Sequence, residues 1–276
     1  MTGQVLRMEK ADVKAEAVDK GDHSSALVQV WRADVTLAGR SILENLSLGL
    51  DEGEIVCVVG PSGSGKTTLL RLLGGLLKPS AGKVLLGGAE MRKPRQDVAI
   101  VFQDYSKALL PWRDAAYNVA LAMEAMGTPR SERPAKIRKL LEMMGLGDHA
   151  SKFPNQMSGG MQQRLQIARC LAQEPKVLLM DEPFGALDAM TRQALQDEVL
   201  AISKQMGTTV FFVTHDLEEA IYLGDRIVGL LPNPGRVGEI FQVNLPRPRN
   251  QLSTREDPEF LRLRRALFDF IERAER

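Results

Sequence analysis

The 276-residue chain has few cysteines, few aromatic side chains, almost no net charge and no long apolar run. Two cysteines are too few for a disulfide framework and lack metal-ligand spacing, so Cys57 and Cys170 are predicted to be buried thiols. A formal charge of +1 provides no overall field for nucleic acid or an anionic membrane. No uncharged run approaches the about 20 residues of a membrane-spanning helix, so the chain is not expected to cross a bilayer by itself.

The chain divides into stretches of different hydrophobic pattern. Residues 1–25 have neither helical nor strand periodicity and are predicted to be a flexible tail. Alternating apolar residues within 27–50 predict half-buried antiparallel strands. Ile55–Val59, Val177–Met180 and Val210–Val213 are continuous apolar runs, typical of central strands covered on both faces. Because helical patterns separate these runs, we predict an α/β fold with a parallel sheet.

Two further stretches have a purely helical pattern. Residues from about 104 to 160 lack apolar strands, which predicts a helical insertion in the α/β core. Asp257-Pro258-Glu259 is a typical helix start, and the apolar residues after it recur on one face. Residues 247–276 are therefore predicted to form an amphipathic helical tail.

A glycine-rich loop follows the first buried strand and precedes a helical pattern that runs to Leu77. Its sequence fits G-x-x-x-x-G-K-[ST], in which backbone N–H groups and the helix N-terminus bind phosphate. We predict that Lys66 reaches the β- and γ-phosphates and that the Thr67 hydroxyl binds Mg²⁺. The alternative, a turn without a ligand, would leave Lys66 as an unpaired charge beside a buried strand. The predicted nucleotide-binding residues of this loop are Gly60, Pro61, Ser62, Gly63, Ser64, Gly65, Lys66, Thr67 and Thr68.

The second buried strand ends in two carboxylates, Asp181 and Glu182. Ligands of open α/β sheets bind at the carboxyl ends of the strands. We predict that Asp181 holds Mg²⁺ through the water shell of the metal, and that Glu182 polarises or deprotonates an attacking water. Such an ending alone is more often a plain strand end, but together with the phosphate loop it indicates a nucleotide hydrolase.

The run Met-Ser-Gly-Gly-Met-Gln-Gln-Arg begins at residue 157, and other phosphate-loop proteins lack it. With this motif, residues from about 26 to 243 resemble the nucleotide-binding subunits of ABC transporters. The resemblance implies a P-loop NTPase (RecA-like) parallel-sheet core with an antiparallel β subdomain and a helical insertion, in a nucleotide-binding domain of residues 26–246. It also implies a head-to-tail dimer closed by two ATP molecules. Ser158, Gly159 and Gly160 would then bind the γ-phosphate of the ATP held by a second copy.

The resemblance implies roles for three further residues. Gln103, at the end of a predicted strand, matches the Q-loop that senses Mg²⁺ and water. Asp188 matches the D-loop that crosses the dimer interface, and His215 matches the switch histidine that contacts the γ-phosphate and positions Glu182. The expected catalytic residues are Lys66, Gln103, Glu182 and His215, and the expected Mg²⁺ residues are Thr67, Gln103 and Asp181.

Two positions depart from the family pattern. Met161 stands where the family usually has Gln, although the adjacent Ser-Gly-Gly is intact. Leu37 stands where an aromatic ring normally stacks on adenine, and Trp31 lies too early in the chain to replace it. We therefore expect only modest discrimination between ATP and GTP.

The stretch Leu109-Leu110-Pro111-Trp112 and the sequences around Asp181 and His215 look most like the nitrate, sulfonate and taurine importer group. This resemblance implies an ATP-hydrolysing translocase subunit, peripheral at the cytoplasmic face of the inner membrane. Its partners would be permease subunits and, indirectly, a periplasmic or extracellular solute-binding protein, with no nucleic acid. The stretch Leu109–Trp112 would be either a packed loop or a groove for a short permease helix.

A non-transport ABC ATPase, of the DNA-repair or ribosome-associated type, is the alternative. A DNA-repair protein needs a long coiled coil or zinc insertion between Gln103 and Ser158, and the intervening stretch is too short for one. A ribosome-associated protein would carry two nucleotide domains, and this sequence has one phosphate loop.

Overall fold

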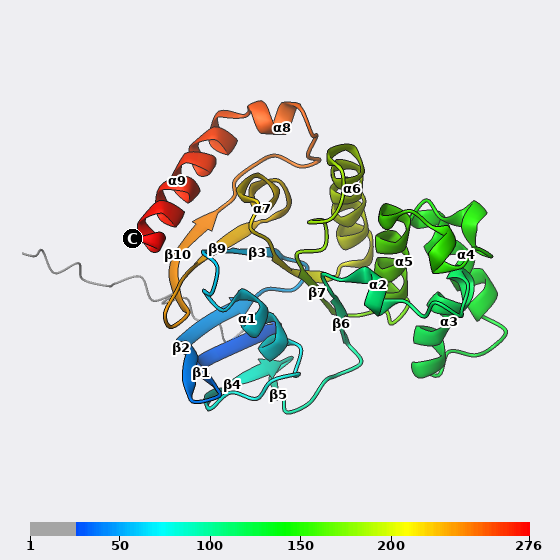
Figure 1. The fold of residues 1–276 in the computed structure, drawn as a ribbon, viewed down its shortest axis with the longest axis horizontal. Coiled ribbons are helices and arrows are strands. Elements are labelled where there is room, and N and C mark those ends of the chain that lie inside the picture. The colour runs from blue at the N-terminus through cyan, green and yellow to red at the C-terminus, as the bar shows by residue number, and fades with distance from the viewer. Residues whose placement is uncertain (1–25) are drawn as a thin grey trace, which may run out of the picture.

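Two β-sheets of different type lie side by side in the computed structural model, which describes residues 26–276 (Figure 1). The smaller sheet has the order β2-β1-β4-β5 and is antiparallel throughout. Its strands are β1 (Val28–Leu37), β2 (Arg40–Leu50), β4 (Ala81–Leu86) and β5 (Ala89–Glu90). The alternating pattern predicts β1 and part of β2, whereas β4 and β5 were not predicted because Ala81–Leu86 does not alternate and its first three residues are exposed. The predicted tail, residues 1–25, lies outside the described residues.

The larger sheet has the strand order β10-β9-β3-β8-β7-β6. All neighbouring pairs are parallel except β9 and β10, which form an antiparallel hairpin at one edge. The strands are β3 (Ile55–Val59), β6 (Val98–Val101), β7 (Val177–Asp181), β8 (Thr209–Val213), β9 (Arg226–Leu231) and β10 (Arg236–Gln242). The α/β class with a parallel-sheet core and an antiparallel β subdomain is thus confirmed.

The larger sheet has an apolar core on each face. Val56 and Val58 of β3 point to the core shared with the smaller sheet and helix α1 (Lys66–Leu73). Ile55, Cys57 and Val59 point to the opposite core, which the remaining large helices cover. Two covered faces explain why β3, β7 and β8 are buried at every position and almost entirely apolar. Both cysteines are free and buried, as predicted.

A helical arm projects from the sheet between β6 and β7 (Figure 1, green). It contains α2 (Tyr105–Ala108), α3 (Ala115–Ala125), α4 (Arg133–Met143) and α5 (Gly159–Leu171), with short turns of 3₁₀ helix at Gly147–His149 and Pro154–Gln156. This region matches the helical insertion expected from the sequence. The helix predicted for Lys66–Leu77 is shorter than expected, because α1 ends at Leu73 before Gly74 and Gly75, of which Gly75 has a positive φ.

The remaining helices cover the face of the larger sheet opposite α1. They are α6 (Ala189–Met206), α7 (Leu217–Leu223), α8 (Ser253–Glu256) and α9 (Pro258–Glu275). Helix α9 begins where Asp257-Pro258-Glu259 predicts it, with the Asp257 side chain accepting a hydrogen bond from Glu259 N. Its apolar face, Phe260, Leu263, Leu267 and Phe270, is buried. Within residues 26–276, none of the helices is long and apolar enough to cross a membrane.

Candidate functional site

The glycine-rich loop connects the carboxyl end of β3 to the first residue of α1. Gly63 and Gly65 have φ angles of +80° and +88°, conformations that favour glycine. A side chain at Gly65 would also meet Leu43 Cδ2 at 2.6 Å, so β2 packs directly under the loop. The loop therefore presents backbone N–H groups at a helix N-terminus, which is a geometry that binds phosphate.

Lys66 lies at the centre of this loop. Its ammonium group donates hydrogen bonds to Gly60 O at 2.7 Å and Pro61 O at 3.0 Å. Partial burial lowers the pKa of Lys66, while the charges of Glu182 and Asp181 oppose that shift. A cation is thus held between the loop and the acidic end of β7, where it can neutralise phosphate oxygens.

Asp181 ends β7 and lies beside the first turn of α1. The Thr67 hydroxyl donates to Asp181 Oδ1 at 3.2 Å, and burial raises the pKa of this carboxyl group. Within the described part of the chain, no group of three His, Cys, Asp or Glu side chains could hold a metal ion alone. A hydroxyl and a carboxylate suit Mg²⁺, which usually keeps several waters and takes further oxygens from substrate phosphates. The donor set therefore fits Mg²⁺ bound together with a nucleotide.

Glu182 is the meeting point of three segments. Its Oε2 accepts a hydrogen bond from Gln103 Nε2 at 3.0 Å and lies 3.3 Å from His215 Nδ1. Glu182 also has a φ of +44°, which is unusual for a non-glycine residue and typical of functional sites. The structure thus brings Gln103, Glu182 and His215 together at the same sheet edge as Lys66 and Asp181, where a carboxylate can accept a proton from water.

The predicted signature residues lie at the start of α5, which belongs to the helical arm (Figure 1). The Ser158 side chain caps α5 by accepting a hydrogen bond from Met161 N at 3.3 Å. A Cβ atom on Gly160 would meet Thr191 Cγ2 at 2.6 Å, so this glycine lets α5 approach α6 closely. Ser158 is exposed, and its helix N-terminus is open to an anion from outside the chain.

Asp188 makes no hydrogen bond to Glu182 in the described structure. Its side chain accepts a hydrogen bond from Thr191 N at 3.0 Å and caps α6. Hydrogen bonding by Thr191 lowers the pKa of the Asp188 carboxyl group. Asp188 and Gly160 therefore lie next to the same residue, Thr191.

The position at which the family usually stacks an aromatic ring on adenine has no aromatic side chain here. Leu37 ends β1 and is partly exposed. Trp31 is engaged elsewhere, because the charged groups of Arg32 and Lys83 lie 5.3 and 5.4 Å from its ring centroid. The weak base stacking expected from the sequence remains a prediction.

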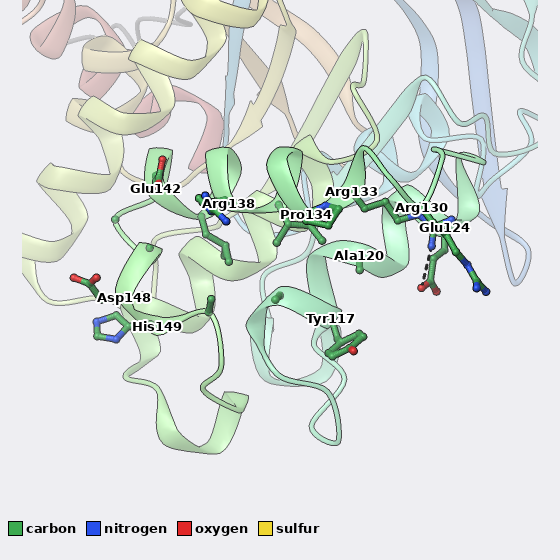
Figure 2. A pocket seen from close by; sticks show the side chains of 16 residues that line it. Tyr117, Ala120, Glu124, Arg130, Arg133, Pro134, Arg138, Glu142, Asp148 and His149 are labelled. Carbon is green, nitrogen blue, oxygen red and sulfur yellow. Dashed lines mark hydrogen bonds and ion pairs between the residues drawn. The ribbon is translucent and has the colours of Figure 1, made fainter.

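A large hollow in the helical arm was not predicted from the sequence. It has a volume of about 1120 Å³ and lies between α3 and α4, beside the 3₁₀ turn at Gly147–His149. Figure 2 shows Tyr117 on α3 facing Pro134 and Arg138 of α4 across it. Trp112 does not line the hollow but lies just before α3 and is 72% exposed. One feature of the sequence is consistent with such a hollow: α4 is mostly polar, and it buries only Leu140 and Leu141.

A phosphate-binding loop beside a strand end with two carboxylates defines a phosphate-loop nucleotide hydrolase. Comparison with known proteins makes the class specific, since the family model described as ABC transporter matches residues 43–185. The chain belongs to the ATP-binding proteins of ABC transporters, and it is an ATPase coupled to transport.

Three curated relatives are similar over most of the chain. A nitrate import ATP-binding protein, NrtD of Synechococcus elongatus, is 43% identical over 84% of this chain and 85% of its own length. A bicarbonate transport ATP-binding protein, CmpD of Synechocystis, is 44% identical over 84% of this chain and 82% of its own. A taurine import ATP-binding protein, TauB of Pseudomonas entomophila, is 42% identical over 87% and 94%.

Two solved structures have the same fold. CbiO1 from Clostridium perfringens, part of the ABC transporter complex cbiONQ, aligns with a TM-score of 0.74 and 25% identity over 86% of this chain and 94% of its own. The ATP-binding cassette MJ0796, a dimer bound to ADP and Pi in a post-hydrolysis state, aligns with a TM-score of 0.67 and 32% identity. That alignment covers 79% of this chain and 99% of the cassette. The P-loop NTPase core expected from the sequence is thus confirmed, and the non-transport alternative is not favoured.

Proposed function

We propose that this protein is the ATP-hydrolysing subunit of an importer for a small oxyanion-bearing solute. The relatives are named as ATP-binding proteins of nitrate import, bicarbonate transport and taurine import, and each of these solutes carries a planar or tetrahedral group of oxygens. The observation that carries the ATPase part is the convergence of Gln103 and His215 on Glu182, next to the phosphate loop. Bicarbonate extends the solute group expected from the sequence, which named nitrate, sulfonate and taurine.

The residues at the sheet edge would each have a separate role in ATP hydrolysis. Residues 60–68 bind the phosphates, and Lys66 neutralises the β- and γ-phosphates. Thr67, Asp181 and Gln103 would hold Mg²⁺, which neutralises phosphate charge when bound. Glu182 accepts a proton from the attacking water, while His215 and Gln103 fix the orientation of its carboxylate.

A second copy of the chain would complete each site. The exposed Ser158 and the amides of Gly159 and Gly160 lie at a helix N-terminus that suits the γ-phosphate of an ATP bound to the other copy. Asp188 lies on the same surface and would cross the interface. The dimer of the related cassette MJ0796 supports this arrangement.

The hollow between α3 and α4 is a suitable docking surface for a permease segment. It is open and lined by both apolar and charged side chains, among them the exposed ring of Tyr117, and the exposed ring of Trp112 lies just before α3 in the same arm. Exposed aromatic side chains are typical anchors of protein interfaces. Residues 26–246 would form the nucleotide-binding domain and 247–276 a helical extension, in a peripheral subunit at the cytoplasmic face of the inner membrane. A solute-binding protein would act from the other side.

Co-purification with the permease tests this function. The chain is co-expressed with a permease and a solute-binding protein of this importer class from the same organism, and the complex is extracted in detergent and reconstituted. We expect the two subunits to co-purify, and ATP hydrolysis to rise when nitrate, bicarbonate or taurine is added with the binding protein. The variant Lys66→Ala serves as the inactive control. Hydrolysis with no membrane partner and no response to any of the three solutes would contradict the proposal.

A further inference from the structure

Two side chains of α5 join this helix to the outer edge of the larger sheet. Strand β6 is the last strand in the order of that sheet, and within the described residues only β7 pairs with it. Gln166 Nε2 donates a hydrogen bond to Phe102 O at 3.2 Å. One helical turn further on, Cys170 Sγ donates to Ile100 O at 3.3 Å. Residues four apart lie on one face of a helix, so one face of α5 covers the edge of β6.

Gln166 is a polar side chain in apolar surroundings. It is 0% exposed, and its neighbours Leu165 and Ile167 belong to the apolar core. Its Oε1 atom is buried and has no hydrogen-bond partner among the described residues. A buried polar atom without a partner costs free energy, which an apolar side chain of similar length would avoid. The stability of the fold therefore does not by itself explain a glutamine at this position.

The hydrogen bond from Gln166 ends at the residue directly before Gln103. The ring of Phe102 is 45% exposed, so its own packing holds this residue only in part. Gln103 is itself exposed, and its Nε2 donates to Glu182 Oε2 at 3.0 Å. Two successive hydrogen bonds therefore connect α5 with the Glu182 carboxylate, one to the backbone at Phe102 and one from the side chain of Gln103.

Helix α5 also carries the residues that would meet the second copy of the chain. Ser158 caps this helix, and Gly159 and Gly160 lie in its first turn. Gln166 follows about two turns later on the same helix. The proposed contact with the neighbouring ATP and the contact with the backbone before Gln103 thus belong to one helix.

We propose that Gln166 is a positioning residue for ATP hydrolysis, which holds the backbone at Phe102 so that the Gln103 amide stays on the Glu182 carboxylate. This inference deepens the function proposed above and rests on the roles given there to Gln103 and Glu182. Gln166 is fully buried and does not touch the reacting atoms. Its effect is on orientation, and misplacing a catalytic group by about 1 Å can cost up to about a hundredfold in rate.

Steady-state phosphate release by variants of the full-length chain tests this role. Gln166→Met keeps the length of the side chain and removes the hydrogen-bond donor. We expect kcat to fall about tenfold and the KM for ATP to stay within about twofold, because orientation affects the transition state and not nucleotide binding. Gln166→Ala adds no bulk and should show the same pattern, so it replaces Gln166→Met if that variant does not fold. An unchanged kcat would overturn the proposal.

Cys170→Ala is the matched control. It removes the other contact between the same face of α5 and the same strand edge, at Ile100, three residues before Gln103. We expect it to lower the midpoint of chemical denaturation, because it leaves a small cavity in the core, and to keep kcat within about twofold of the wild type. A fall in kcat as large as that of Gln166→Met would mean that loosening the edge is sufficient, and the positioning role would be wrong.

A double-mutant cycle shows whether Gln166 acts through Gln103. Gln103→Ala removes the amide that Gln166 is proposed to position. In that background, Gln166→Met should lower kcat by less than a further twofold or so, because both changes affect one interaction. Losses that simply add would contradict the proposal.

The wild type and Glu182→Gln are measured in the same series. If Glu182→Gln is inactive and Gln166→Met has the kcat of the wild type, the proposed catalytic site stands and the positioning role alone is overturned. Normal hydrolysis by Glu182→Gln would overturn the catalytic roles together with the positioning role that rests on them.

Discussion

Two regions of the molecule are built in opposite ways. One is the catalytic edge, the end of the larger sheet at which Gln103, Glu182 and His215 meet, and the other is the groove, the hollow between α3 and α4 in the helical arm. At the edge, Gln103, His215 and Glu182 come from separate segments, and their side chains meet within 3.3 Å. In the groove, Arg130 and Arg138 are exposed to solvent around a hollow of about 1120 Å³ (Figure 2). The contrast indicates that the groups around Glu182 are positioned within one chain, whereas the hollow in the arm is left open by the chain's own side chains.

The largest effect should come from the catalytic edge. Glu182→Gln removes the group that we propose as the acceptor of the proton of the attacking water, so we expect ATP hydrolysis to slow by at least about a hundredfold. Nucleotide binding should be retained, because Lys66 and the loop glycines are unchanged. Phosphate release and equilibrium ATP binding are measured together, with Glu272→Gln on the exposed face of α9 as the control. Near-normal turnover would show that Glu182 does not act as the base.

A smaller effect, on stability, should come from the close contact between α5 of the arm and α6. In Gly160→Ala the new Cβ would overlap Thr191 Cγ2, and such overpacking typically costs about 1–3 kcal/mol of unfolding free energy. Thr191→Ser removes the overlapping methyl group, so the double variant should regain most of the stability in chemical denaturation. A stable Gly160→Ala protein would contradict this account of the close contact. Restored stability without restored hydrolysis would assign Gly160 a further role at the phosphate.

The helical arm should affect transport rather than basal ATP hydrolysis. We expect Trp112→Ala to lower transport stimulated by the binding protein several-fold, as for the loss of an aromatic interface anchor, with basal ATP hydrolysis nearly unchanged. Trp31→Ala is the matched control, because Trp31 is also exposed but lies in the smaller sheet. An equal fall in transport and basal hydrolysis would contradict the division between edge and arm.

The smallest expected effect is on the choice between the nucleobases of ATP and GTP, which depends on neither of the two regions. Without a ring at Leu37, we expect the affinities for ATP and GTP to differ by no more than about tenfold. Competition binding of the two nucleotides measures this ratio. A preference above roughly a hundredfold would mean that about 2.7 kcal/mol comes from base contacts at another residue.

The sequence was most informative where a local pattern fixes the local structure. Continuous apolar runs predicted β3, β7 and β8, and the phosphate loop follows β3 as its motif requires. The hydrogen bond between Gln166 and Phe102 could not be predicted, because it depends on how α5 packs against β6 after each has formed. The groove was missed for the same reason, since no periodicity within α3 or α4 indicates the space between them. The lesson is that motifs reveal the chemistry, while supporting contacts and docking surfaces arise from tertiary packing.

The central claim is that each catalytic site is completed by a second copy of the chain. Light scattering of Glu182→Gln, which should bind ATP without hydrolysing it, measures this most directly. We predict the mass of a monomer without nucleotide and twice that mass with Mg²⁺ and ATP, and no doubling when Lys66→Ala is added to prevent binding. A monomer mass under saturating Mg²⁺ and ATP would contradict the account.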